Sequence, residues 1–223
     1  MDVRLPLSGR RAQAARNDRV ILDAARAVFV ADPDAPISAV AERAHVGISA
    51  LYRRYASKDD LLRQVCLDGL HRYTAAAETA LAREDDPWAA FAEFLHAVVE
   101  RDTHSLTMRL AGTFTPSEEL YLEAERAQQL NVRLFERTRT AGALRPDVEV
   151  DDIAMVLEQV AAVRLRDPAR TEQLRRRYLT LLLDALRGPA LTPLPGPPPT
   201  WREIGERWDV VAVDSRPARP SER

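Results

Sequence analysis

Apolar residues recur at helical spacing along most of this chain, in segments separated by short breaks rich in proline, glycine and aspartate. In the first segment, Val20, Ala24 and Val28 lie one turn apart, which is the pattern of a helix with one buried face. Comparable stripes predict further helices over residues 58–81, 87–101, 105–114, 117–141, 152–165 and 168–186. The sequence therefore predicts an all-α fold.

Residues 37–62 depart from this pattern, because two short helical segments flank a tight break. We expect the first helix over 37–44 and the second over 48–55, with the break at residues 45–47. Gly47 suits this break as a helix N-cap or as a residue in left-handed geometry. Two short helices across a three- to four-residue turn form a helix–turn–helix, whose second helix enters the DNA major groove.

Within the second short helix the two faces differ sharply in character. Leu51 and Tyr55 lie four residues apart on the apolar face. The opposite face carries Ser49, Tyr52, Arg53 and Arg54. Ser57, with Asp60 three residues later, predicts the N-cap of a third helix that begins at once. We expect a small domain of three helices packed around Phe29, Val40, Leu51, Tyr55 and Leu62.

At these residues the chain resembles the tetracycline-repressor (TetR) family of bacterial regulators. The matching positions are Ala44, Val46, Leu51, Tyr52, Lys58, Leu61 and Leu62, with Tyr55 in place of the family's phenylalanine. His45 replaces the family's turn glycine, and histidine tolerates left-handed geometry better than most residues. Ala50 replaces a threonine that usually touches DNA, so one contact is expected to be missing.

The resemblance implies that the second short helix reads DNA. We expect Tyr52 and Lys58 to contact phosphates and Gly47 to offer a backbone N–H there. Ile48, Ser49 and Arg53 are the candidates for the major groove, where an arginine pairs well with a guanine edge. Arg54 is expected on either the backbone or a base. For each of these residues the alternative is a solvated surface side chain.

The amino-terminal residues 1–16 are predicted to be a flexible basic arm, because arginines outnumber acidic residues there and hydrophobicity is low. Arg10 and Arg11 would lie in a minor groove or along phosphates; the alternative is a solvated tail. The net charge of −2 argues against indiscriminate coating of DNA.

Composition limits the class of protein further. Hydrophobic residues make up 46% and charged residues 30%, typical of a globular protein, and no apolar run approaches the roughly 20 residues that span a bilayer. No apolar signal-peptide segment opens the chain. The single Cys66 excludes an internal disulfide and favours a cytoplasmic location; we expect a buried thiol rather than a redox sensor.

Residues 63–187 are predicted to form a helical ligand-binding and dimerisation domain, following the DNA-binding domain at 17–62. The helix over 58–81 is expected to join the two, as a lever that moves the DNA-binding domain or as a plain connection. The resemblance implies a small-molecule pocket, and apolar or aromatic side chains suit such a lining. The candidates are Trp88, Phe91, Met108, Phe114, Tyr121, Phe135 and Glu158, each of which is otherwise ordinary core.

The resemblance also implies that the last two helices, 152–165 and 168–186, pair with a second copy in a four-helix dimer interface; the alternative is core packing. Residues 188–223 are expected to be a proline-rich linker and a tail, with the two-tryptophan segment 201–213 docking on its own or a partner subunit.

No catalytic constellation is found, and no cofactor is expected. Glu93 and His96 form a Glu-x-x-His spacing used by di-iron bundles, but they lie opposite the apolar stripe and lack a second such pair, so a solvated face is expected. We expect a homodimeric transcriptional repressor that a small-molecule ligand releases from a palindromic operator. The alternatives are a non-specific architectural DNA-binding protein and a helical ligand carrier or enzyme without specific DNA binding.

Overall fold

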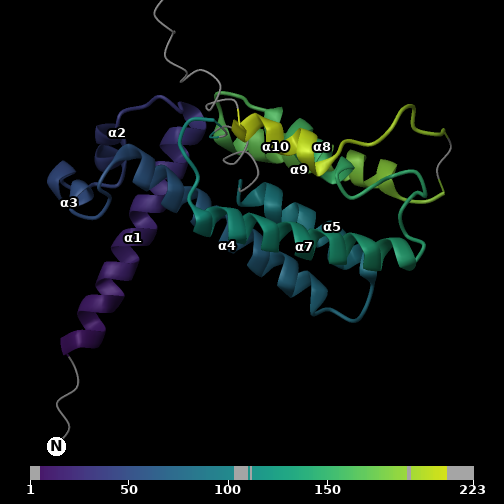
Figure 1. Ribbon diagram of the computed structural model, residues 1–223, viewed down its shortest axis with the longest axis horizontal. Coiled ribbons are helices and arrows are strands. Elements are labelled where there is room, and N and C mark those ends of the chain that lie inside the picture. The colour runs from purple at the N-terminus through teal and green to yellow at the C-terminus, as the bar shows by residue number, and fades with distance from the viewer. Residues whose placement is uncertain (1–5, 103–109, 111, 190–191, 210–223) are drawn as a thin grey trace, which may run out of the picture.

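The computed structural model describes the backbone of residues 6–102, 110, 112–189 and 192–209, and the side chains of 18–102, 110, 112–189 and 192–205. These residues form helices and, apart from one isolated bridge between Leu144 and Arg187, no β-structure (Figure 1). The helices are α1 (Pro6–Ala31), α2 (Ile37–Arg43), α3 (Ile48–Tyr52), α4 (Lys58–Leu81), α5 (Pro87–Glu100), α7 (Glu118–Thr140), α8 (Asp152–Ala162), α9 (Pro168–Leu186) and α10 (Trp201–Asp209). The all-α prediction is confirmed, while the helix expected over 105–114 falls mostly outside the described residues.

Side-chain caps explain why several boundaries were predictable. The Ser57 hydroxyl accepts from the Asp60 backbone N–H at 3.1 Å, which fixes the start of α4. Ser117 caps α7 in the same way, and Asp86 and Asp167 cap α5 and α9, each followed by a proline in the first turn. Both α4 and α9 have their predicted limits.

The start of α1 corrects the sequence prediction. The helix begins at Pro6, so most of the segment expected to be a flexible arm is helical. Proline suits a first helical turn, and the alanine, arginine and glutamine residues that follow are strong helix formers that outweigh the single Gly9. Arg10 and Arg11 therefore lie on a helix; their side chains are outside the described residues.

The buried residues divide into two clusters. The first unites α1–α4 and contains all five predicted core residues, Phe29, Val40, Leu51, Tyr55 and Leu62. It also contains Leu110, Phe114 and Leu120, which the sequence assigned to the second domain. The predicted boundary at residue 62 is therefore too sharp, because part of the following bundle completes the amino-terminal core.

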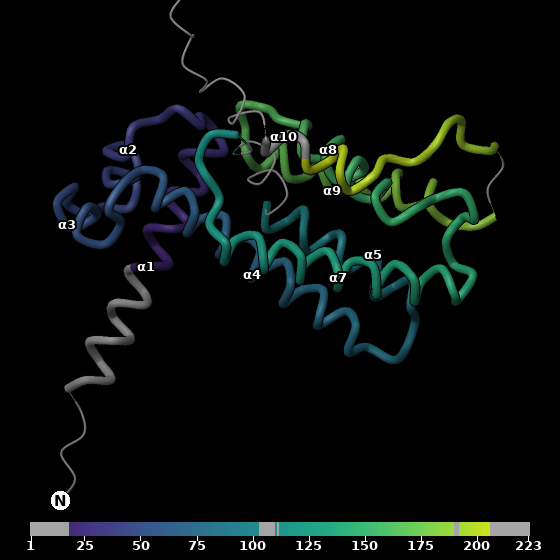
Figure 2. The backbone as a smooth tube through the Cα atoms, viewed as in Figure 1, coloured from purple at the N-terminus to yellow at the C-terminus, as the bar shows by residue number. Residues whose placement is uncertain are grey.

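The second cluster joins α5, α7, α8 and α9 with the carboxyl-terminal half of α4. Helix α5 is central: it packs against α4, α7, α8 and α9. Helices α4 and α7 lie side by side along much of their length, as the backbone trace shows (Figure 2). Helix α4 therefore contributes to both cores.

The segment after α9 is fixed by a pair of charged residues. Arg145 pairs with Asp147 at 2.6 Å and donates to the Thr192 carbonyl at 2.6 Å, while Asp147 accepts from the Leu194 backbone N–H at 2.8 Å. These bonds hold the proline-rich linker against the end of the bundle. In α10, Trp201 remains 48% exposed, so the expected docking of this segment stays a prediction.

The two cores predict different local effects of similar substitutions. Phe114→Leu should destabilise the protein by about 1 kcal/mol and raise amide hydrogen exchange chiefly in α1 and the first half of α4. Phe91→Leu, a matched change in the second core, should raise exchange chiefly in α5, α8 and α9. Identical exchange patterns for the two variants, measured by mass spectrometry, would show that the cores are not distinct.

Candidate nucleic-acid interface

The turn between α2 and α3 is closed by a left-handed residue. His45 has φ 54°, the conformation that glycine adopts most readily. Its backbone N–H donates to the Glu42 carbonyl at 3.1 Å, and that of Val46 donates to the Ala41 carbonyl at 3.0 Å. This is the hydrogen-bond pattern of a Schellman motif, which ends α2 and redirects the chain. The predicted left-handed geometry of His45 is confirmed.

Helix α3 is anchored by one face and exposed on the other. Leu51 is fully buried, and Tyr55, just beyond the helix, is nearly so. Burial raises the pKa of the Tyr55 phenol. Ile48 and Tyr52, which are 40% and 50% exposed, point away from the core. The helix is shorter than predicted, because it ends at Tyr52 rather than at residue 55.

Gly47 is the N-cap of α3, as predicted. Its φ of −67° is open to any residue, and a Cβ atom at this position would meet nothing within 4 Å. The fold itself therefore does not require glycine here.

The three basic side chains near α3 differ in how they are held. Arg54 forms an ion pair with Asp18 of α1, which offsets its charge. Lys58 donates to the Pro33 carbonyl at 2.9 Å and lies 5.3 Å from the centre of the Phe29 ring. The Arg53 side chain is exposed and forms no hydrogen bond or ion pair with any described side chain.

A four-charge cluster fixes α1 against α4. Arg26, which is almost wholly buried, pairs with Asp23 at 3.0 Å and with Asp68 at 2.5 Å. Arg72 bonds the same two carboxylates, each at 2.9 Å. Because every charge has opposite partners, the cluster holds the two helices in one register without leaving a buried charge unpaired. The sequence did not single out these residues, since their pairing is visible only once α1 lies beside α4.

The structure does not gather the predicted pocket residues into one site. Phe91 and Phe135 are fully buried in the second core, while Phe114 lies in the first. Tyr121 is exposed on α7, Glu158 is half-buried, and Met108 lies outside the described residues. The remaining candidate, half-buried Trp88, has the Arg187 guanidinium 5.0 Å from its ring centre. Aromatic type alone could not distinguish core from pocket.

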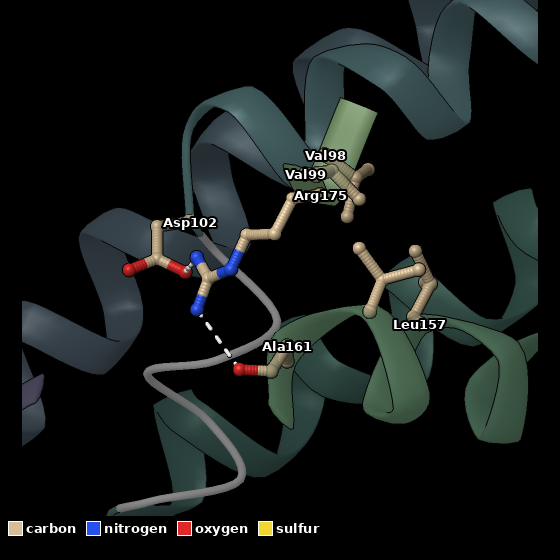
Figure 3. Close-up of a pocket in the computed structure, with 7 residues that line it drawn as sticks. Val98, Val99, Asp102, Leu157, Ala161 and Arg175 are labelled. Atoms are coloured by element: carbon tan, nitrogen blue, oxygen red, sulfur yellow. Dashed lines mark hydrogen bonds and ion pairs between the residues drawn. The ribbon is translucent and has the colours of Figure 1, made fainter. Parts of the chain in front are cut away.

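A small cavity lies instead between α5, α8 and α9 (Figure 3). Its volume is about 10 Å³, and it is lined by aliphatic side chains that include Val98 and Leu157. Arg175 closes one side with an ion pair to Asp102 of 2.6 Å. No sequence pattern marks this site, because Arg175 lies among solvent-facing charges on α9 and its burial depends on how α5 and α8 approach.

The Glu-x-x-His spacing and the single cysteine have structural explanations among the described residues. No cluster of three metal-binding side chains occurs among the described residues. Glu93 and Glu100 instead pair with Arg83 and Arg176, and burial lowers the pKa of the half-buried His96. Burial also raises the pKa of the Cys66 thiol to about 12, so the predicted buried, unreactive thiol is supported.

An outward-facing short helix, anchored by its apolar side and preceded by a tight left-handed turn, defines a helix–turn–helix DNA-binding protein. Residues 21–65 match the bacterial regulatory proteins of the tetR family, and residues 86–188 match the carboxyl-terminal domain of SbtR-like transcriptional regulators. The chain belongs to the TetR family of DNA-binding transcriptional regulators, which are not enzymes. The predicted resemblance is thus confirmed.

Solved structures agree with this assignment. A TetR regulatory protein from Mycobacterium vanbaalenii is 28% identical over 80% of this chain and 99% of its own, with a TM-score of 0.54. A TetR regulator from Streptomyces coelicolor is 24% identical, covers 77% and 99%, and has a TM-score of 0.57. The TetR-like regulator LfrR from Mycobacterium smegmatis, solved in complex with proflavine, has 21% identity, 81% and 99% coverage, and a TM-score of 0.61.

No curated protein sequence matches the chain significantly. None of the helices within the described ranges is long and apolar enough to cross a membrane.

The left-handed turn predicts how substitutions at residue 45 behave. His45→Gly should leave stability unchanged or raise it by up to about 1 kcal/mol, because glycine adopts this φ without strain. His45→Val should lower stability by about 1–2 kcal/mol, since a β-branched residue resists positive φ. Urea unfolding measures both, and equal stability of the two variants would contradict the turn geometry.

Proposed function

We propose that the protein is a homodimeric repressor that reads a palindromic operator with α3 and is released from it by a small-molecule effector. The observation that carries this proposal is the exposed face of α3, where Arg53 has no ionic partner among the described side chains. A dimer would place two copies of this face on half-sites one helical turn apart.

Within that proposal the residues divide by role. Ile48, Ser49 and Arg53 enter the major groove, where the Arg53 guanidinium pairs with a guanine edge. Tyr52 contacts a phosphate. Gly47 offers its backbone N–H to another, and the absence of any internal need for glycine is consistent with close approach of DNA.

The other cationic contacts are more constrained. Lys58 keeps two of its three N–H donors for a phosphate while the third remains on the Pro33 carbonyl. Arg54 reaches DNA only by sharing or leaving Asp18, so we assign it a secondary backbone contact. Arg10 and Arg11 would meet DNA from the amino-terminal part of α1 rather than from an unstructured arm.

Dimerisation is proposed through α8 and α9. Tyr178 and Leu181 on α9 are 46% and 54% exposed, and Leu165 between the two helices is similarly exposed. A second copy packing on this face would bury all three in a four-helix arrangement. Ala161 and Ala162 at the end of α8 permit close approach.

For the effector we propose the second core around the cavity beside Arg175. LfrR, a structural neighbour, was solved with proflavine bound, which supports ligand binding by this architecture. The cavity of about 10 Å³ is no larger than one water requires. The effector site must therefore open as the ligand binds, and a ligand that favours the open state would shift the population away from the DNA-binding form.

Arg53→Ala tests the DNA-reading role. An operator is first selected from random DNA with the wild-type protein, and affinities are then measured by fluorescence anisotropy. We expect a loss of about 1–3 kcal/mol on the selected operator and relaxed preference at one base pair per half-site. Arg133→Ala removes an equal charge from the exposed face of α7 and should change neither quantity. Equal effects of both variants, or no selected sequence, would contradict the proposal; the latter favours an architectural protein.

Leu181→Glu tests the dimer interface. Two opposed carboxylates in a buried apolar contact should weaken the dimer at least about 30-fold, which corresponds to about 2 kcal/mol, as measured by sedimentation equilibrium. Leu122→Glu is a matched control, because Leu122 is similarly exposed, at 60% against 54% for Leu181, but lies on α7. If only the α7 variant dissociates, the interface lies elsewhere.

A further inference from the structure

The turn between α8 and α9 touches the DNA-binding domain. Arg164 in this turn donates from Nη1 to the backbone carbonyl of Val30 at 3.2 Å. Val30 is the penultimate residue of α1, so its carbonyl is among those that have no partner within the helix. A cation is favourable at this end of a helix, because the helix dipole is negative there. The contact joins residues that are far apart in the sequence: Val30 belongs to the first core, whereas Arg164 follows α8, a helix of the second core.

The same turn is held from the other side by Arg175, which is only 7% exposed. Arg175 donates from Nε to the Val163 carbonyl at 3.0 Å and from Nη2 to the Ala161 carbonyl at 2.9 Å, so it caps the end of α8. Its Nη1 pairs with Asp102 at the end of α5 (Figure 3). These bonds make the turn a rigid extension of α5, α8 and α9 rather than a loose loop.

We propose that Arg164 is a positioning residue that fixes the orientation of the DNA-binding domain relative to α8 and α9, and thereby sets the half-site spacing that the dimer accepts. This inference rests on the proposed dimer through α8 and α9. Helix α4 and the Phe114 contact attach the DNA-binding domain along one side. The Arg164 contact adds a second attachment at the end of α1, which restricts rotation about α4.

The Arg164 contact also couples the cavity to the orientation of the DNA-binding domain. Arg175 both lines the cavity and holds the turn that carries Arg164. A ligand that parts Arg175 from Asp102 therefore loosens the Arg164 contact with α1. The coupling passes through two side chains and one turn, and each link is a hydrogen bond seen in the structure.

The first test compares Arg164→Leu with Arg166→Leu, a change of equal charge on the same turn at an exposed side chain that bonds no described residue. Hydrogen exchange by mass spectrometry is measured on each full-length protein without DNA. We expect faster exchange over residues 28–36 in Arg164→Leu alone, with an unchanged thermal midpoint in both. Unchanged exchange there, or equal change in both variants, would overturn the inference whatever the protein binds.

The second test uses DNA. Each protein selects from a library of inverted repeats whose half-sites are separated by different numbers of base pairs. Wild-type protein and Arg166→Leu should select one spacing, while Arg164→Leu accepts neighbouring spacings and binds the preferred one about fivefold more weakly. Arg164→Lys, which keeps a donor and the charge, should recover part of the preference.

The outcomes separate the two proposals. If wild-type protein selects no inverted repeat, the proposed dimeric repressor is wrong, and the spacing role falls with it. If wild-type protein selects one spacing and Arg164→Leu selects the same spacing with the same affinity, the repressor stands and the role of Arg164 is wrong. Asp102→Asn should reproduce part of the Arg164→Leu effect, and additive effects in the double variant would contradict coupling through Arg175.

Discussion

Helix α4 is buried along both of its halves, and most of the architecture follows from this. Leu61, Leu62 and Val65 belong to the amino-terminal core, whereas Ala77 and Ala80 belong to the core of the helical bundle. A single rigid helix therefore passes through two packed clusters, and neither domain can rotate without disturbing residues of the other. The contacts of Phe114 with the first cluster strengthen this dependence. This packing supports the interpretation of α4 as a lever in the proposed regulator, since a displacement of the bundle would reach α3 through α4.

The exposed face of α3 exists because the opposite face is so firmly held. Leu51 is fully buried, and the left-handed His45 sets the direction in which α3 leaves α2. The basic residues around α3 differ in how available their side chains are to a partner, because two of them already have partners within the domain. Arg54 forms an ion pair with Asp18, and Lys58 donates to the Pro33 carbonyl. Of these three basic side chains, Arg53 is therefore the one most available to a partner.

The sequence predicted the features that depend on local chemistry. Caps such as Ser57 and Asp86 fix helix starts within a few residues, and the spacing of Leu51 and Tyr55 defines the buried face of α3. It missed features that depend on which segments meet in space. The pairing of Arg54 with Asp18 needs α1 beside α3, and the burial of Arg175 needs α5 and α8 together. The described candidates for the ligand pocket lie in two cores and at the surface, and the sequence could not show this because an aromatic side chain suits a core and a cavity equally.

Whether α3 reads DNA can be measured by hydrogen exchange of the full-length protein with and without its selected operator. Residues 47–53 comprise α3 and its two cap residues, so bound DNA should slow exchange of their backbone amides more than that of any segment of α5 or α7. Protection confined to other surfaces, with residues 47–53 exchanging equally in both states, would show that α3 does not read DNA.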